Sequence, residues 1–372
     1  MSYIIKIVRL LDKYIFGFLA VIIGLFSKLN CKKSSKIIRE VAFIKLWAIG
    51  DSVTTLPLIK KFKEVNKKAK ITLIVTKRNI DVYKEQKFID KIILLDINKI
   101  FEIVHLFKKY DLVFDLEPYL NISALLSWFI GKHRIGFSKQ IRSIVYNERI
   151  PFSKDKHIVN IYLQMIESFS KSNVTSKLVK LELTNNEKKI VNDFLLTNKI
   201  TTKDLIIGVC PGAAESVKER MWPQERFVSL ANNLIKKYNA KIIFIGSPDE
   251  SKLIEQIKYL IKDKTFSSAG KLTLRQTFYL VEKCKIFISN DTGPMHIAVA
   301  QGCKTIGLFG PNTPTRWAPF GKDNISIYHK IHCSPCIINE KGIMPTCVNK
   351  EFQKCMKLIT VEEVCKAVEK LK

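Results

Sequence analysis

Short, continuously apolar runs alternate along the chain with longer segments in which apolar residues recur every three or four positions. Apolar runs rich in β-branched residues are typical of strands buried on both faces of a parallel sheet. The alternation therefore predicts repeated strand–helix units. We expect strands at 41–46, 71–76, 91–95, 111–116 and 134–137, and a second series at 205–210, 241–246, 286–289 and 305–309.

Helical spacing fills the intervals between these strands. The segment 153–204 is mostly helical in pattern and is expected to carry the chain between two domains. The predicted architecture is α/β, with two doubly wound Rossmann-like domains facing a cleft. We expect a leader at 1–40, an N-terminal domain at 41–180, a C-terminal domain at 181–325, and a tail at 326–372 that packs back on the N-terminal domain.

The leader differs from the rest of the chain. Residues 1–40 carry eight Lys and Arg against two acidic residues, and they enclose an uncharged apolar run at 15–26. That run is too short to cross a bilayer, which takes roughly 20 residues. No small-x-small cleavage site follows, so a signal peptide is disfavoured. We predict a basic, apolar helix in the cytoplasmic membrane interface, with a helix packed on the protein's own surface as the alternative.

Charge narrows the choice of partners. The 372 residues include 62 Lys and Arg against 34 Asp and Glu, a formal net charge of +28. Such an excess favours nucleic acid, an anionic membrane or phosphorylated substrates. The chain lacks a helix-turn-helix, an RNA-recognition aromatic motif and a zinc finger, which disfavours nucleic acid. It also lacks G-x-G-x-x-G after a first strand and a P-loop, which disfavours classical dinucleotide binding and P-loop hydrolysis.

Four polar turns follow predicted strands, where open α/β sheets bind ligands. In the first, Asp51 is placed either to cap the next helix or to act as a base, and Gly50 allows a molecule to approach the backbone. The turns span 50–57, 211–223, 246–250 and 290–296.

The last three turns combine small residues with charges, as a site for a diphosphate requires. Either Lys218 or Arg220 could neutralise phosphate. Glu250 could hold a ribose, or it could simply suit the first turn of a helix. The turn at 290–296 is alternatively an ordinary helix start with an Asp or Thr cap. The candidate donor-binding residues are Gly212, Ala213, Lys218, Arg220, Glu250, Asp291, Thr292, Gly293 and His296.

Taken in order, these turns resemble glycosyltransferase family 9, the ADP-heptose:lipopolysaccharide heptosyltransferases. The matching segments lie between about residues 41 and 320. They are Ile49-Gly50-Asp51 with Pro57, Pro211-Gly212-Ala213 with Trp222-Pro223, Gly246-Ser247-Pro248-Asp249-Glu250, Asn290-Asp291-Thr292-Gly293-Pro294-Met295-His296, and Leu308-Phe309-Gly310-Pro311.

The resemblance implies a GT-B fold and an inverting, metal-independent transfer of heptose or a related sugar from a nucleotide sugar, ADP-heptose above all. The acceptor would be a lipid-linked saccharide at the anionic cytoplasmic face of the inner membrane. Asp51 would be the general base, and the donor would lie on the second domain near Glu250, Asp291 and His296. A nucleotide-sugar epimerase of the same fold is the alternative.

Four cysteines in the tail form a separate group. A C-x-x-C pair with two later cysteines can hold a structural zinc. The spacing of the second pair is not that of a standard zinc knuckle, so reduced thiols or a redox-dependent disulfide are the alternatives. The nine cysteines of the chain, without a secretory context, favour a reducing compartment. The four are Cys333, Cys336, Cys347 and Cys355.

Overall fold

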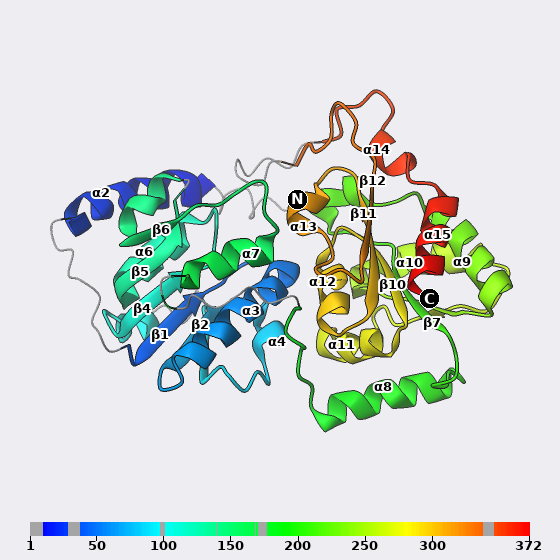
Figure 1. The fold of residues 1–372 in the computed structure, drawn as a ribbon, viewed down its shortest axis with the longest axis horizontal. Coiled ribbons are helices and arrows are strands. Elements are labelled where there is room, and N and C mark those ends of the chain that lie inside the picture. Colours follow the sequence, from blue (N-terminus) through cyan, green and yellow to red (C-terminus); the bar gives the residue numbers. More distant parts are fainter. Residues whose placement is uncertain are drawn as a thin grey trace. The chain divides into compact units, whose positions relative to one another are not determined.

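The computed structural model describes residues 10–28, 38–96, 101–138, 140–167, 169, 177–337 and 346–372. The chain forms two compact units, Met1–Thr175 and Ser176–Lys372. Each unit is built on one six-stranded parallel sheet with helices against it (Figure 1). The prediction of two doubly wound α/β domains is confirmed.

In the first unit the strand order is β3-β2-β1-β4-β5-β6. The order reverses between β1 and β4, whose residues Ile44 and Asp115 are paired at the carboxyl ends. The turns that follow these two strands therefore meet at one edge of the sheet. The strands are β1 (Glu40–Ile44), β2 (Lys70–Val75), β3 (Lys91–Leu94), β4 (Tyr110–Asp115), β5 (Gly131–Phe137) and β6 (Glu148–Ile150).

Helix α3 (Ile49–Val65) follows β1 and packs on α7 (Ile158–Leu163). It begins at Ile49, so Asp51 lies inside its first turn. The further helices of this unit are α4 (Ile80–Tyr83), α5 (Phe101–Val104) and α6 (Asn121–Ile130), with the 3₁₀ turns η3 (Ile141–Val145) and η4 (Gln164–Ile166).

The leader forms a short π-helical turn, η1 (Asp12–Phe16), and helix α2 (Gly17–Lys28), which lie against α6 and η3 (Figure 1). The carboxylate of Asp12 accepts hydrogen bonds from the backbone N–H groups of Asn121 (3.0 Å) and Ile122 (2.9 Å) at the start of α6. Burial raises the pKa of Asp12, although these hydrogen bonds act to lower it. The leader is thus fixed to the first unit at a helix N-terminus.

The leader helix buries small residues and exposes large ones. Gly17, Ala20 and Gly24 are buried against the unit, and a Cβ at Gly24 would lie 2.0 Å from the side chain of Ile144. Residues 1–9 and 29–37, which hold most of the predicted basic charge, lie outside the described residues. Within the described ranges, the structure contains no helix both long and apolar enough to span a bilayer. The exposed large apolar residues are Leu10, Leu11, Tyr14, Ile15, Phe18, Leu19 and Leu25.

The second unit repeats the same order, β9-β8-β7-β10-β11-β12, with β7 and β10 side by side where it reverses. Its strands are β7 (Ile206–Cys210), β8 (Lys241–Phe244), β9 (Phe266–Ser267), β10 (Ile286–Asn290), β11 (Lys304–Phe309) and β12 (Ile325–Tyr328). Its helices before the tail are α8 (Asn185–Thr197), α9 (Gln224–Tyr238), α10 (Ser251–Tyr259), α11 (Leu274–Lys283), α12 (Gly293–Ala300) and α13 (Pro314–Trp317).

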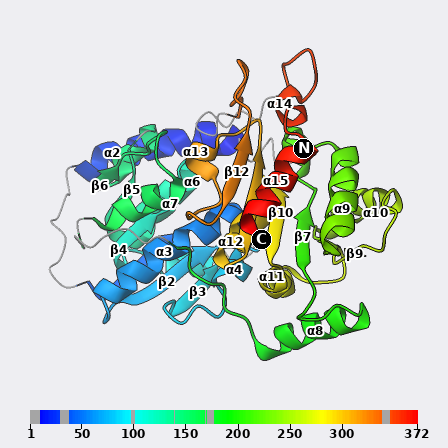
Figure 2. The same ribbon diagram turned by 45° about the vertical axis from the view of Figure 1, so that its right-hand side comes forward.

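The tail belongs to the second unit, which corrects the expectation that residues 326–372 pack back on the N-terminal domain. Its helices α14 (Lys354–Lys357) and α15 (Val361–Leu371) lie against β11, and α15 also packs on α9 (Figure 2). Met356 and Val364 share a buried core with Ile207 of β7. The physical reason is that α9 and β11 provide the apolar surface that covers the apolar face of α15.

Candidate active site

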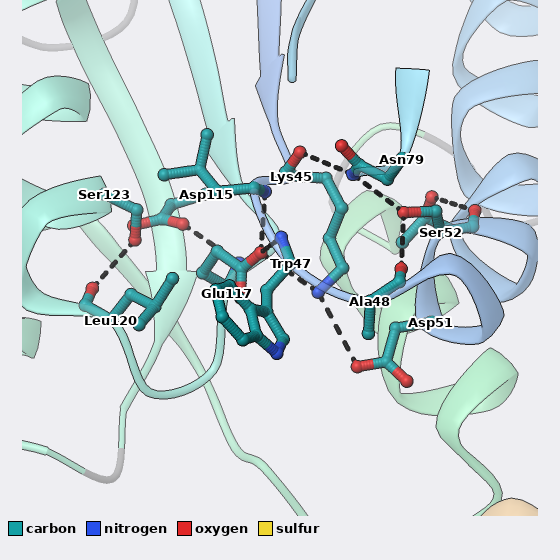
Figure 3. A network of polar contacts seen from close by, with 12 residues as sticks. Lys45, Trp47, Ala48, Asp51, Ser52, Asn79, Asp115, Glu117, Leu120 and Ser123 are labelled. Atoms are coloured by element: carbon teal, nitrogen blue, oxygen red, sulfur yellow. Dashed lines mark hydrogen bonds and ion pairs between the residues drawn. The ribbon is translucent and has the colours of Figure 1, made fainter. Parts of the chain in front are cut away.

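A buried ion pair holds the turn after β1 (Figure 3). Lys45 follows β1 directly, is fully buried, and places its ammonium 3.1 Å from the carboxylate of Glu117, which follows β4. The same oxygen of Glu117 accepts the backbone N–H groups of Leu46 (2.7 Å) and Trp47 (2.8 Å). One carboxylate therefore ties the ends of the two central strands together.

Asp51 lies next to this pair. Its carboxylate is 3.8 Å from the ammonium of Lys45, and its side chain is 27% exposed where that of Lys45 is 0% exposed. The N-cap of α3 is Ala48, three residues earlier, so the alternative that Asp51 caps the helix is not what the structure shows. Gly50 is buried in the same turn. The arrangement places an accessible carboxylate beside a buried cation at the switch point of the sheet.

The ionisable groups near Asp51 and Lys45 differ in their charge states at neutral pH. Burial acts to lower the pKa of Lys45, but the carboxylates of Glu117 and Asp51 outweigh it, and the pKa is raised. Burial raises the pKa of Tyr83 to about 12. Burial, followed by the charge of Asp51, raises the pKa of Tyr162 well above its ordinary value. Near neutral pH Lys45 is therefore charged and both phenols are neutral.

In the second unit Asn290 ties the corresponding two turns. Its side chain is fully buried at the end of β10. It donates to the carbonyls of Pro211 (2.8 Å) and Gly212 (3.2 Å) after β7, and it accepts the backbone N–H of Trp222 (3.1 Å). The indole N–H of Trp222 in turn donates to the carbonyl of Ile359 in the tail (3.0 Å). A neutral amide thus fixes the backbone of the candidate donor turns.

Asp291 brings Arg220 to the start of α12. Its carboxylate lies 3.3 Å from the guanidinium of Arg220 and accepts the side-chain N–H of Asn312 (2.9 Å). Arg220 also donates to the backbone carbonyl of Asp291 (2.9 Å). Lys218 is exposed, and its carbonyl accepts from Gln353 (2.9 Å). Of the two cations that the sequence left open, the structure therefore places Arg220 at this turn.

The remaining residues of the turn belong to α12, which begins at Gly293. Thr292 precedes the helix, and its hydroxyl lies 3.3 Å from the carbonyl of Asn290 and 3.2 Å from the hydroxyl of Ser289. His296 is buried within the helix. Thr292 occupies the N-cap position of α12, but its side chain makes no capping hydrogen bond, and the carboxylate of Asp291 instead binds Arg220 and Asn312.

Glu250 reaches the turn after β7. Its carboxylate accepts the backbone N–H of Ser247 (2.7 Å), as a residue in a helix first turn does. A Cβ at Gly212 would lie 1.9 Å from Oε1 of Glu250, so the two residues are in close contact. Burial raises the pKa of Cys210, at the end of β7, to about 12, and the charge of Glu250 adds to it. Ala213 follows Gly212 and is partly exposed.

The four tail cysteines line one small cavity, together with residues such as Pro311 and Gln353. All four are free thiols, and burial raises the pKa of Cys355 to about 11. Within the described ranges, no group of three or more His, Cys, Asp or Glu side chains is arranged to hold a metal ion. The zinc alternative therefore gains no support from these side chains. The four are Cys333, Cys336, Cys347 and Cys355.

Sequence reasoning missed the residues that join the turns. Lys45 lies inside the strand expected at 41–46, and Glu117 directly follows the strand expected at 111–116, so neither stands in one of the four polar turns. The available signal was a single charge directly after an apolar run, at two strands that the switch-point rule brings together. Asn290 belongs to the polar turn at 290–296, but no local pattern predicts its long-range partners, and none points to Asn312.

Comparisons with known proteins point to one family. The model of glycosyltransferase family 9 (heptosyltransferase) matches residues 105–345. The lipopolysaccharide core heptosyltransferase OpsX of Haemophilus influenzae is 25% identical over 350 residues, 90% of this chain and 97% of the relative. The lipooligosaccharide heptosyltransferase 2 of Campylobacter jejuni is 27% identical over 330 residues, 87% and 95% of the two chains.

Solved structures agree in fold. The glycosyl transferase of family 9 from Veillonella parvula superposes with a TM-score of 0.76 at 22% identity, covering 92% of this chain and 99% of that one. This likeness confirms the GT-B architecture that the family resemblance implies.

Proposed function

The chain belongs to glycosyltransferase family 9 and is a glycosyltransferase, and we propose that it transfers heptose from ADP-heptose to a lipopolysaccharide core saccharide with inversion at the sugar. The observation that carries the proposal is the pair of polar turns at the switch points of the two sheets. One turn presents an accessible carboxylate, and the other presents an arginine at a helix start. Acid–base chemistry and stabilisation of an anionic leaving group need these two features.

Asp51 is the proposed general base. A base must reach the attacking hydroxyl, and Asp51 is part-exposed at the carboxyl edge of its sheet. Its carboxylate would accept the proton of an acceptor hydroxyl as the bond between the sugar and the phosphate breaks. Lys45 cannot take this part, because its side chain is fully buried and paired with Glu117.

The diphosphate is proposed to bind at the start of α12. Backbone N–H groups at a helix N-terminus favour anions, and Arg220 adds a guanidinium there. Gly212 and Ala213 would let the nucleotide approach the backbone after β7, and Glu250, in contact with Gly212, would hold the ribose. Thr292, Gly293 and His296 complete the proposed donor set, and Lys218 stays at its rim.

The outward face of the leader is proposed to bind the anionic cytoplasmic face of the inner membrane. A helix that folds only against its own domain would bury its large apolar side chains. Here the small residues face inward, and Phe18 and Leu25 are 66% and 61% exposed. Ile141 of η3, against which α2 packs, is also 63% exposed. The formal net charge of +28 favours an anionic bilayer.

A transfer assay tests the reaction. Purified full-length protein would be incubated with ADP-heptose and heptose-deficient lipid A–core saccharide, and ADP release and glycan mass would be measured. We expect ADP release that depends on the acceptor and a product one heptose heavier. A reaction of the sugar with donor alone would instead indicate the epimerase. A thermal-shift panel of nucleotide sugars would identify the preferred donor, and the absence of any shift or product would refute the proposal.

Vesicle binding tests the membrane face separately. The variant Phe18→Ser/Leu25→Ser should lose affinity for vesicles that contain phosphatidylglycerol, because it removes apolar area from the outward face. Leu196→Ser is the matched control, since Leu196 is 70% exposed on α8 of the other unit. Equal binding by wild type and both variants would contradict a membrane role for the leader.

A further inference from the structure

Lys45 is a buried cation for which the proposed reaction has no direct use. Its side chain is 0% exposed, so it cannot touch a substrate. Burying a lysine is costly unless carboxylates compensate it. Here two carboxylates do so, Glu117 at 3.1 Å and Asp51 at 3.8 Å. A buried charge at this position indicates a role beyond packing in the core.

The two partners of Lys45 are held very differently. Glu117 is buried and also accepts two backbone N–H groups, so it is fixed. Asp51 is part-exposed on the first turn of α3, on the side open to solvent. The carbonyl of Lys45 itself accepts from the side chain of Asn79 (2.9 Å), whose N–H also reaches Ser52 (2.9 Å) beside Asp51. Lys45 and Glu117 are therefore the buried members of the triad, and Asp51 is its part-exposed member (Figure 3).

We propose that Lys45 is a positioning residue of the transfer reaction, which keeps the carboxylate of Asp51 ionised and turned to one side, with Glu117 as the counter-ion that retains Lys45. A cation within about 4 Å favours the charged form of a carboxylate, and the nearby negative charge of Glu117 opposes this. The balance of the two sets the pH below which Asp51 no longer accepts a proton. This inference rests on the proposed role of Asp51 as the base.

The other titratable groups that act on this triad are Tyr83 and Tyr162 and, through Glu117, Arg142 and Asp12. Arg142 stays charged over the whole range in which a carboxylate titrates. Tyr83 on α4 and Tyr162 on α7 are the phenols of the helices packed against α3. Both keep their protons over the range in which a carboxylate titrates, because burial raises the pKa of each. Lys45 and Glu117 are thus the charges whose removal should move the acid limb of the rate profile.

Two substitutions with opposite expected effects test the proposal. The pH profile of kcat/KM would be measured with ADP-heptose and heptose-deficient lipid A–core saccharide. Lys45→Met should move the acid limb to higher pH by about one unit, because Asp51 loses its cation and keeps the nearby Glu117 charge. Glu117→Gln should move it to lower pH, because the glutamine oxygen still accepts the N–H groups of Leu46 and Trp47 while the opposing charge is gone.

The control variants distinguish an effect on the pH profile from a loss of folding stability. Lys45→Arg keeps the charge and should keep the limb near its wild-type pH. Lys63→Met removes a more exposed ion pair of the same helix, that with Asp90 at 2.8 Å near the other end of α3, and should leave the profile unchanged. If Lys45→Met proves too unstable to assay, Glu117→Gln with Lys45→Arg still decides. An acid limb that stays at wild-type pH in Glu117→Gln would overturn the proposal, whatever happens to melting temperature.

The failure of this inference is distinct from that of the reaction proposal. If Asp51→Asn is inactive but the charge variants leave the acid limb in place, Asp51 remains the base and Lys45 is merely structural. If Asp51→Asn is fully active, both the base and its positioning residue are overturned.

Discussion

The two units have the same strand order, yet their switch points are fastened with different chemistry. In the first, a charged pair joins the turns after β1 and β4, because Lys45 and Glu117 meet at 3.1 Å. In the second, the neutral side chain of Asn290 joins the turns after β7 and β10 by hydrogen bonds to the carbonyls of Pro211 and Gly212. The ion pair of Arg220 with Asp291, at 3.3 Å, spans the same two turns. The same topology therefore supports two unlike local electrostatic environments.

This difference indicates a division of labour. A buried cation next to an accessible carboxylate can tune proton transfer. At the second switch point Asn290 fixes the backbone without charge, and Asp291 holds the guanidinium of Arg220 beside the N–H groups of α12, which suits the binding of a diphosphate. Changes at the first switch point should therefore act on turnover and its pH dependence, and changes at the second should act on donor affinity and stability.

The largest expected effect is that of Asp51→Asn, which keeps the size of the side chain and removes its basicity. Turnover should fall by about 10²–10⁴, the usual contribution of a general base. Donor affinity and melting temperature should barely change, because the N-cap of α3 is Ala48. Asp51→Ala should be no less active than Asp51→Asn within the same assay. Full activity of Asp51→Asn would show that the switch point of the first unit does not supply the general base.

Asn290→Ala is expected to show the next largest effect, as a loss of folding stability. It leaves the carbonyl of Pro211 and the N–H of Trp222 without their partner in a buried place. Each such group costs roughly 1–3 kcal/mol, so denaturant unfolding should report a loss of several kcal/mol. Donor affinity should also fall, because the turn after β7 is released.

Asn324→Ala is the matched control for that experiment. Asn324 likewise joins two backbone groups, Thr305 N–H (2.9 Å) and the carbonyl of Phe320 (2.8 Å), but at the amino end of β11. It should lower stability without lowering donor affinity. Equal losses of donor affinity in both variants would show that Asn290 has no special relation to the donor turns.

Much of the fold was predictable because buried parallel strands are apolar throughout. The strands β2, β4 and β10 lie within one residue of the expected bounds. Short strands carry too little pattern, so β6 and β9, with three and two residues, were missed. The placement of the tail was wrong because amphipathicity shows that α15 has an apolar face without showing which core covers it.

The sequence predicted the four polar turns of the candidate site, but it did not predict the contacts that join the turns after β1 and β4 and those after β7 and β10. Topology rules state that the ends of adjacent central strands meet, and this brought Asp51 and Asp291 into consideration. The contacts that fix the turns span 72 residues between Lys45 and Glu117, and 79 between Pro211 and Asn290. No local pattern encodes such contacts, since each depends on the register of two strands. The choice between Lys218 and Arg220 likewise required the path of the backbone.

Arg220→Gln tests whether the switch point of the second unit binds the diphosphate. The guanidinium is fixed by Asp291 at the start of α12, so its loss should weaken ADP binding by about ten- to a hundredfold, as expected for a hydrogen bond to a charged group. Lys218→Gln removes an exposed cation and should change affinity little. Isothermal titration with ADP at fixed ionic strength measures both. A larger loss for Lys218→Gln would reverse the assignment.

The smallest expected effect concerns the contact between Gly212 and Glu250. In Gly212→Ala the new Cβ would lie 1.9 Å from the carboxylate of Glu250, which must rotate away from the turn after β7. If Glu250 holds the ribose, donor affinity should fall about three- to tenfold, and Glu250→Ala should cause a loss of the same order. The double variant should then be little worse than Glu250→Ala alone, because residues in contact give non-additive effects. Titration with ADP of the wild type, both single variants and the double variant completes the cycle. Additive losses would mean that Gly212 acts through the backbone it offers to the nucleotide and that Glu250 serves the helix start at Ser247, where it accepts the backbone N–H at 2.7 Å.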